Sequence, residues 1–172
     1  MKKYKSQIRF SHLVWVVLLG LFVSACGFQL RGQHQLPVQM DRVYLDGSMS
    51  VNLQRELRHA LQRAGSQVVN QVGDASAITK VHDVRYTRHV LSIGAVARVR
   101  EYSGRYQLQY EVRLSSGKIL QDKDWLYYQR EFSYGVEQIL SKEREEVRLK
   151  LDMQRQAVDT ILRRLSYQST RK

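Results

Sequence analysis

Three long runs of this chain alternate apolar and polar side chains with a period of two, and this alternation constrains the fold more than any other feature. Successive side chains of a strand point to opposite faces, so such a run predicts a strand with one apolar and one polar face. Two of the runs lie around 83–90 and 126–134, and the third and clearest run spans 105–114. Its apolar set is Tyr106, Leu108, Tyr110, Val112 and Leu114, and its polar set is Arg105, Gln107, Gln109, Glu111 and Arg113. Such strands are typical of an antiparallel sheet that is covered on one face only.

Two segments have helical spacing instead. The first runs from Ser50, the expected N-cap, to Gly65, the expected end, with apolar residues at Leu53, Leu57, Ala60, Leu61 and Ala64. The second follows Ser141, its expected N-cap, and its apolar stripe consists of Val147, Leu151, Val158, Ile161, Leu162 and Leu165. Leu149 and Met153 fall outside this stripe, on a smaller apolar face that either contacts a partner or is incidental.

A shorter strand is expected at 43–45, where the turn signal Asp46-Gly47 ends it. With 172 residues and one proline, the chain is expected to form a single globular domain. The predicted fold class is therefore α+β, with two helices packed on one face of a roughly four-stranded, mainly antiparallel sheet.

The first 25 residues have the layout of a secretory signal peptide. Lys2, Lys3, Lys5 and Arg9 precede an uncharged stretch, 13–25, which is too short to favour a permanent transmembrane helix. The stretch ends in Val-Ser-Ala before Cys26, which resembles the lipobox read by bacterial lipoprotein signal peptidase. That resemblance implies cleavage after residue 25, S-diacylglycerol and N-palmitoyl groups on Cys26, and, with Gly27 in the next position, sorting to the outer membrane. The alternative is that Cys26 is a buried free thiol. We expect 26–42 to be a lipidated tether and 43–172 to be the domain.

The sequence lacks the motifs of the common enzyme classes. It has no GxSxG, HExxH, Walker A or GxGxxG pattern, and its single cysteine excludes a disulfide, a four-cysteine zinc site and a CxxC pair. Residues 115–118 match SxxK but lie in an expected turn rather than at the start of a helix. His82 and His89 are expected on opposite faces of a strand, unless a bulge intervenes. We therefore expect neither an enzyme nor a metal site, and no cofactor besides the covalent lipid.

Positive charge dominates the chain, with 28 Lys and Arg against 16 Asp and Glu, a formal charge of +12. Loss of the four basic residues of the signal segment would leave 24 basic and 16 acidic side chains, or +8. Such a charge favours a polyanionic partner, and an exported lipoprotein without an aromatic-and-basic RNA motif is not expected to bind nucleic acid.

Basic residues gather at two places, around Arg98 and Arg100 in the bend between the first two long strands, and around Lys142 where the last helix begins. Guanidinium and ammonium groups bind phosphates through charge-assisted hydrogen bonds, and lipopolysaccharide is the abundant phosphorylated polyanion beside the outer membrane. A solvated charged surface is the alternative interpretation.

Three stretches of the chain carry a recognisable pattern. The first is Cys-Gly-Phe-Gln-Leu-Arg-Gly at 26–32, followed by Leu-Pro at 36–37. The second is 132–146, with Leu-Ser-Lys-Glu at 140–143, and the third is 155–165, with its closing Ile-Leu-Arg-Arg-Leu. These stretches resemble the LptE family of lipopolysaccharide-assembly lipoproteins, and the middle strands agree with that family only in their pattern.

The resemblance implies a non-enzymatic α+β protein at the cell outer membrane, lipid-anchored through Cys26 and enclosed in the lumen of the LptD β-barrel as a one-to-one heterodimer. It further implies that the protein helps LptD to assemble and binds lipopolysaccharide on its way to the outer leaflet. Lys142 matches one of the family's lipopolysaccharide-binding positions. The bend is longer here than in the family, so either Arg98 or Arg100 matches the other position. The alternative is an outer-membrane lipoprotein that acts as an envelope-binding or adaptor module with no role in lipopolysaccharide transport.

Overall fold

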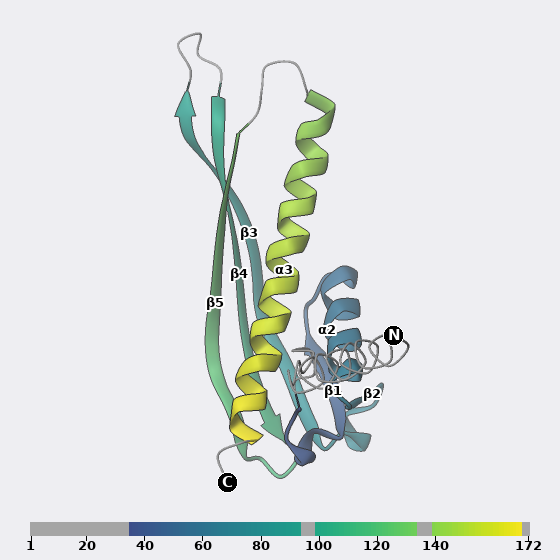
Figure 1. Cartoon of the computed structure of the whole chain (residues 1–172). Helices are drawn as coiled ribbons and strands as arrows, with labels where there is room; N and C mark the ends of the chain where they lie inside the picture. Colours follow the sequence, from purple (N-terminus) through teal and green to yellow (C-terminus); the bar gives the residue numbers. More distant parts are fainter. Residues whose placement is uncertain (1–34, 94–98, 134–138, 170–172) are drawn as a thin grey trace, which may run out of the picture. The chain divides into compact units, whose positions relative to one another are not determined.

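Five strands of the described residues form one mixed sheet, in the order β2-β1-β3-β4-β5 (Figure 1). The computed structural model describes residues 35–93, 99–133 and 139–169, and these belong to one compact unit, Gln33–Lys172. The strands are β1 (Arg42–Gly47), β2 (Gln67–Val69), β3 (Ala77–Ile93), β4 (Val99–Leu114) and β5 (Ile119–Ser133). The helices are α2 (Val51–Arg63) and α3 (Ile139–Ser169), with 3-10 turns at Val38–Met40 and Val72–Asp74. The predicted α+β class is confirmed.

The three long strands form an antiparallel meander, as the alternation predicts. Tyr106 of β4 pairs with Tyr86 of β3 on one side and with Tyr128 of β5 on the other. The inward residues of β4 are buried, and the outward ones, from Arg105 to Arg113, are exposed or half-buried. The alternation therefore identifies the faces of the sheet correctly.

The short strands differ from the expectation in number and direction. β1 pairs in parallel with β3 at Val43–Gly47, and β2 adds a fifth strand parallel to β1. Because β2 has three residues, it is too short to show an alternation. The crossover through α2 makes the β1–β2 pair parallel, as in other strand-helix-strand units.

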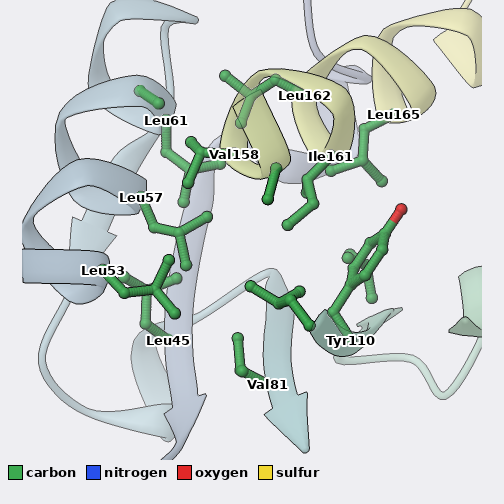
Figure 2. Packing of buried hydrophobic residues seen from close by; sticks show 14 of the residues in the cluster. Leu45, Leu53, Leu57, Leu61, Val81, Tyr110, Val158, Ile161, Leu162 and Leu165 are labelled. Atoms are coloured by element: carbon green, nitrogen blue, oxygen red, sulfur yellow. The ribbon is translucent and has the colours of Figure 1, made fainter. Parts of the chain in front are cut away.

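The helix α2 has the ends that the sequence predicts. The Ser50 hydroxyl oxygen accepts a hydrogen bond from the backbone N–H of Leu53 at 3.3 Å. After the helix, Gly65 adopts a φ of 92°, a left-handed conformation that glycine reaches without a Cβ penalty. Figure 2 shows the apolar side of α2, with Leu53, Leu57 and Leu61, turned toward Val158 of α3.

The helix α3 differs from the prediction in its start and in the earlier part of its buried side, whereas Val158, Ile161, Leu162 and Leu165 of the predicted stripe are buried as expected. It begins at Ile139, so Ser141 lies inside the helix and is not its N-cap. Met153 is fully buried in the core, whereas Val147 of the predicted stripe is 56% exposed. Met153 belongs with Ala157, Ile161 and Leu165 to one buried cluster, and α2 lies beside the later part of α3, which leaves the earlier part of the helix without that neighbour (Figure 1). Met153 is therefore a core residue, and the prediction that it lies apart from the apolar stripe was wrong.

The described part of the segment 26–42 packs on the domain. Met40 is 1% exposed, and its carbonyl oxygen accepts a hydrogen bond from the Ser66 hydroxyl at 2.5 Å. Arg42 already belongs to β1. The last residues before 43 are thus part of the fold, and those before residue 35 lie outside the described residues.

Candidate functional site

The predicted site residues lie at or beyond the edge of the described structure. Cys26 and Arg98 fall outside the described residues, as do the signal segment and most of the tether. Arg100 belongs to β4 and Lys142 to the first turns of α3, with only their backbone described. Lipidation of Cys26 and lipopolysaccharide contact by Arg98, Arg100 and Lys142 stay predictions.

The sheet topology brings the segments that carry these residues to one end of the sheet. Ile93 at the end of β3 pairs with Val99 at the start of β4, and Glu101 of β4 pairs with Ser133, the last residue of β5. The connection from β3 to β4 and the exit from β5 therefore lie at the same end (Figure 1). Since α3 begins at Ile139, five residues separate this exit from the helix. We call this end, away from β1 and β2, the distal end.

A carboxylate of α3 ties the helix to β3 close to the distal end. The Arg88 guanidinium pairs with Glu146 at 2.8 Å, and the Tyr86 hydroxyl donates to the other carboxylate oxygen of Glu146 at 3.1 Å. Glu146 raises the pKa of Arg88, so this cation stays charged. The Lys150 ammonium lies over the Tyr86 ring, 5.4 Å from its centroid. These contacts fix the segment of α3 that follows Lys142.

Aromatic packing continues the core toward the distal end. Tyr102 of β4 and Phe132 of β5 stack with their ring centroids 5.7 Å apart and their planes 14° from parallel. The Arg88 guanidinium lies 5.2 Å from the Tyr102 centroid. Tyr102 and Phe132 are both buried, so the covered face of β4 and β5 stays buried close to the distal end.

The opposite face of the sheet is polar, and no described helix covers it. It presents Arg105, whose Nε donates to the side-chain oxygen of Gln129 at 3.1 Å, together with Gln107 and Gln109. Trp125 and Tyr127 also lie on this face, with ring centroids 5.9 Å apart. The alternation places Tyr127 on the polar face correctly, but sequence reasoning missed the pair that it forms with Trp125. Two aromatic residues spaced by two in a strand were the available signal.

The two histidines of β3 lie on the same face, contrary to the prediction. A β-bulge at His82 shifts the alternation by one residue, and this brings both side chains to the polar face. His82 lies 3.3 Å from Glu111, whereas His89 is opposite Ser103, far along β4. Among the described residues, no group of three or more His, Cys, Asp or Glu side chains is placed to hold a metal ion.

Comparison with known proteins decides the family. The family model of LptE, described as lipopolysaccharide-assembly, matches residues 37–165, which include every described strand and most of α3. The chain belongs to the LptE family. Membership in the LptE family makes it a lipoprotein with a role in lipopolysaccharide assembly, and therefore a protein of the cell envelope. No helix of the described ranges is long and apolar enough to span a bilayer.

Relatives of this chain agree with the family assignment. The LPS-assembly lipoprotein LptE of Pectobacterium atrosepticum is 28% identical over 160 residues, which cover 90% of this chain and 85% of the relative. The solution structure of lipoprotein B from Nitrosomonas europaea superposes with a TM-score of 0.68 at 28% identity, covering 84% of this chain and 94% of that one. The crystal structure of rare lipoprotein B from Shewanella oneidensis has a TM-score of 0.64 at 22% identity, covers 75% and 96% of the two chains, and supports the fold alone.

Proposed function

We propose that this LptE-family chain is an outer-membrane lipoprotein that plugs the LptD β-barrel as a one-to-one partner, helps it to assemble, and binds lipopolysaccharide during delivery to the outer leaflet. In this proposal, residues 1–25 are removed and Cys26 carries the S-diacylglycerol and N-palmitoyl groups. The observation that carries the proposal is the convergence of the β3–β4 connection and the start of α3 at the distal end.

The distal end suits an anionic lipid because its predicted binding residues are all basic. Arg98 belongs to the connection between β3 and β4, Arg100 to the start of β4, and Lys142 to the start of α3. Phosphate groups accept charge-assisted hydrogen bonds from guanidinium and ammonium groups, which are stronger than bonds between neutral groups. The contacts of Glu146 with Arg88 and Tyr86 hold α3 beside β3. They therefore support a fixed position of the start of α3 relative to the end of β3.

A plug inside a barrel needs a surface that tolerates a polar lumen. The lumen of a large outer-membrane barrel is lined by polar side chains. The uncovered sheet face, with Arg105, Gln107 and Gln109, is compatible with such a polar lumen and supports the proposal. The proposal assigns no catalytic residue and no cofactor.

The test is purification with a partner. We would tag the C-terminus, extract outer membranes in mild detergent, and identify the proteins that co-purify in stoichiometric amount by mass spectrometry. A large β-barrel at one to one is the expected result. A matched preparation of the Cys26→Ser variant would show whether the association needs the anchor. A chain that arrives alone, or with a protein other than a barrel, would overturn the plug assignment and favour the adaptor module.

A further inference from the structure

The uncovered face of the three long strands carries a regular array of side chains that the proposed distal contact does not use. Strand register sets them in rows across β3, β4 and β5. The rows are Asp83–Gln109–Trp125, Arg85–Gln107–Tyr127 and Thr87–Arg105–Gln129. Directly opposed side chains on one face lie within contact distance. We call the six residues Arg85, Arg105, Gln107, Trp125, Tyr127 and Gln129 the outer strip.

Aromatic surface is exposed on the outer strip. Tyr127 is 65% exposed, and its ring stacks against Trp125. Next to this pair the surface is hollowed, and the hollow is lined by Arg105, Gln107, Tyr127, Tyr128 and Gln129. An apolar ring beside amide and guanidinium groups offers a ligand one flat contact and several hydrogen bonds in the same place.

This combination matches the chemistry of a sugar ring. A pyranose has a face of C–H groups with partial positive charge, which packs on the negative face of an aromatic ring. Its edges carry hydroxyl groups, which amide and guanidinium side chains can bind. Gln107 and Gln129 supply both donors and acceptors at the hollow.

The charges of the outer strip select among sugars. Arg85 pairs with Asp83 at 3.2 Å, and this carboxylate offsets its charge. Arg105 donates through Nε to the neutral amide of Gln129, and no carboxylate of the described residues lies within ion-pair distance of it. The guanidinium of Arg105 therefore keeps its full charge beside the hollow, which favours a ligand with an anionic substituent.

We propose that the outer strip binds a phosphorylated oligosaccharide, with a sugar ring on Tyr127 and Trp125 and a phosphate at Arg105. The inference rests on the proposed lipopolysaccharide function and deepens it. It assigns the saccharide part of that ligand to the sheet face, whereas Arg98, Arg100 and Lys142 remain the proposed contacts at the distal end. The same chemistry occurs in a free phosphorylated oligosaccharide, so the experiment compares the two sources.

Trp125 provides a direct signal for this site. The sequence has two tryptophans, and Trp15 lies in the segment expected to be removed. We would separate the lipidated chain from co-purifying proteins, titrate it in mild detergent with the phosphorylated oligosaccharide released from lipopolysaccharide by mild acid, and follow tryptophan fluorescence. Dextran of similar size and inorganic phosphate are the comparison probes. A saturable change with the phosphorylated oligosaccharide, and responses at least about tenfold weaker with the two comparison probes, is the expected result. An equal response to dextran would overturn the proposal.

Two variants and matched controls locate the site by calorimetry. Tyr127→Ala and Arg105→Gln should each weaken oligosaccharide binding about tenfold. Tyr167→Ala and Arg155→Gln change similarly exposed residues on α3, on the other side of the sheet, and should leave binding unchanged. Equal affinities for the natural chain and Tyr127→Ala would overturn the assignment of the outer strip.

Intact lipopolysaccharide separates this proposal from the function on which it rests. If intact lipopolysaccharide binds and the released oligosaccharide does not, the outer strip is not a saccharide site, while the proposed function stands. If neither ligand binds, the proposed lipopolysaccharide contact fails as well. If both bind and Tyr127→Ala weakens both, the strip contacts the saccharide within the intact ligand.

Discussion

Gly104 provides the space in which the Tyr86 ring crosses β4. A Cβ added at this glycine would lie 2.7 Å from the Tyr86 hydroxyl oxygen and 3.2 Å from Cε2 of the ring. Glycine inside a strand weakens it, and it is found where another group approaches the backbone closely. Here that group is the tyrosine whose hydroxyl donates to Glu146. The absence of a Cβ at Gly104 therefore permits the hydrogen bond between Tyr86 of β3 and Glu146 of α3.

We predict that Gly104→Ala destabilises the chain by about 1–2 kcal/mol, because the new methyl group displaces the Tyr86 hydroxyl. Gly73→Ala is the control, since nothing lies within 4 Å of a Cβ at that position. Urea unfolding followed by circular dichroism measures the free energy of unfolding of both variants. In a Tyr86→Phe background the cost of Gly104→Ala should shrink, because the hydroxyl that lies closest is absent. A Gly104→Ala midpoint equal to that of Gly73→Ala would contradict this account.

Glu111 on the polar sheet face makes the stability depend on acid. A hydrogen bond from Arg113, with the His82 ring 3.3 Å away as a second contact, holds the pKa of Glu111 below its ordinary value of 4.5. A carboxylate whose pKa is lowered by folding stabilises the fold above its unfolded pKa, and this stabilisation is lost as the pH falls through the folded pKa.

We predict that the natural chain loses stability as the pH falls below 4.5, and that Glu111→Gln loses less over the same interval. Urea midpoints measured between about pH 6 and pH 3 give the two curves. Glu131→Gln removes one exposed negative charge from the same face and serves as the control. Parallel curves for the natural chain and Glu111→Gln would show that the carboxylate is not stabilised by folding.

At the scale of elements, α3 buries the later part of the row that periodicity selects, Val158 to Leu165, but it buries Met153 and leaves Val147 exposed. The helix contacts β4, β5 and α2, and α2 lies beside its later part (Figure 1), so the side that is buried depends on which neighbour is present. Periodicity counts apolar residues on a face but does not show where a neighbouring element stops.

We predict that Met153→Ala destabilises the chain by about 2–5 kcal/mol, because it opens a cavity among fully buried neighbours. Val147→Ala should change stability by less than about 0.5 kcal/mol, since that side chain is largely exposed. Denaturant unfolding of the two variants gives the comparison. A larger loss of stability from Val147→Ala than from Met153→Ala would contradict this account and support the apolar stripe that the spacing alone selects.

The elements also show how far the sequence can predict the fold and the site. Alternation over 105–114 determines a long strand and its faces, because the signal is local and repeated. The short strand β2, the parallel pairing of β1 and the bulge at His82 depend on contacts between distant segments, and nothing local specifies them. The basic positions at the distal end came from charge and resemblance, whereas the Trp125–Tyr127 pair became visible only when the strands were in register.

At the scale of the molecule, the core and the proposed lipopolysaccharide contact lie at different ends of the long strands. The helix α2 and the strands β1 and β2 pack against the end of β3 that begins at Ala77. At the distal end, the described elements are β3, β4, β5 and the start of α3. Because few core residues depend on the distal end, its charges can be changed with little effect on folding.

The last prediction concerns the distal charges. The double variants Arg98→Glu/Lys142→Glu and Arg100→Glu/Lys142→Glu should weaken lipopolysaccharide binding about tenfold or more, because they place repulsive charges beside phosphates. The control is Lys118→Glu/Lys123→Glu, which makes the same change in net charge with exposed residues near the opposite end of β4 and β5. Binding to immobilised lipopolysaccharide at fixed ionic strength measures all three, because salt screens such contacts. The arginine whose variant loses more affinity is the contact residue. Equal losses in all three variants would mean that lipopolysaccharide responds to the overall charge of the molecule and that the distal end is not its site.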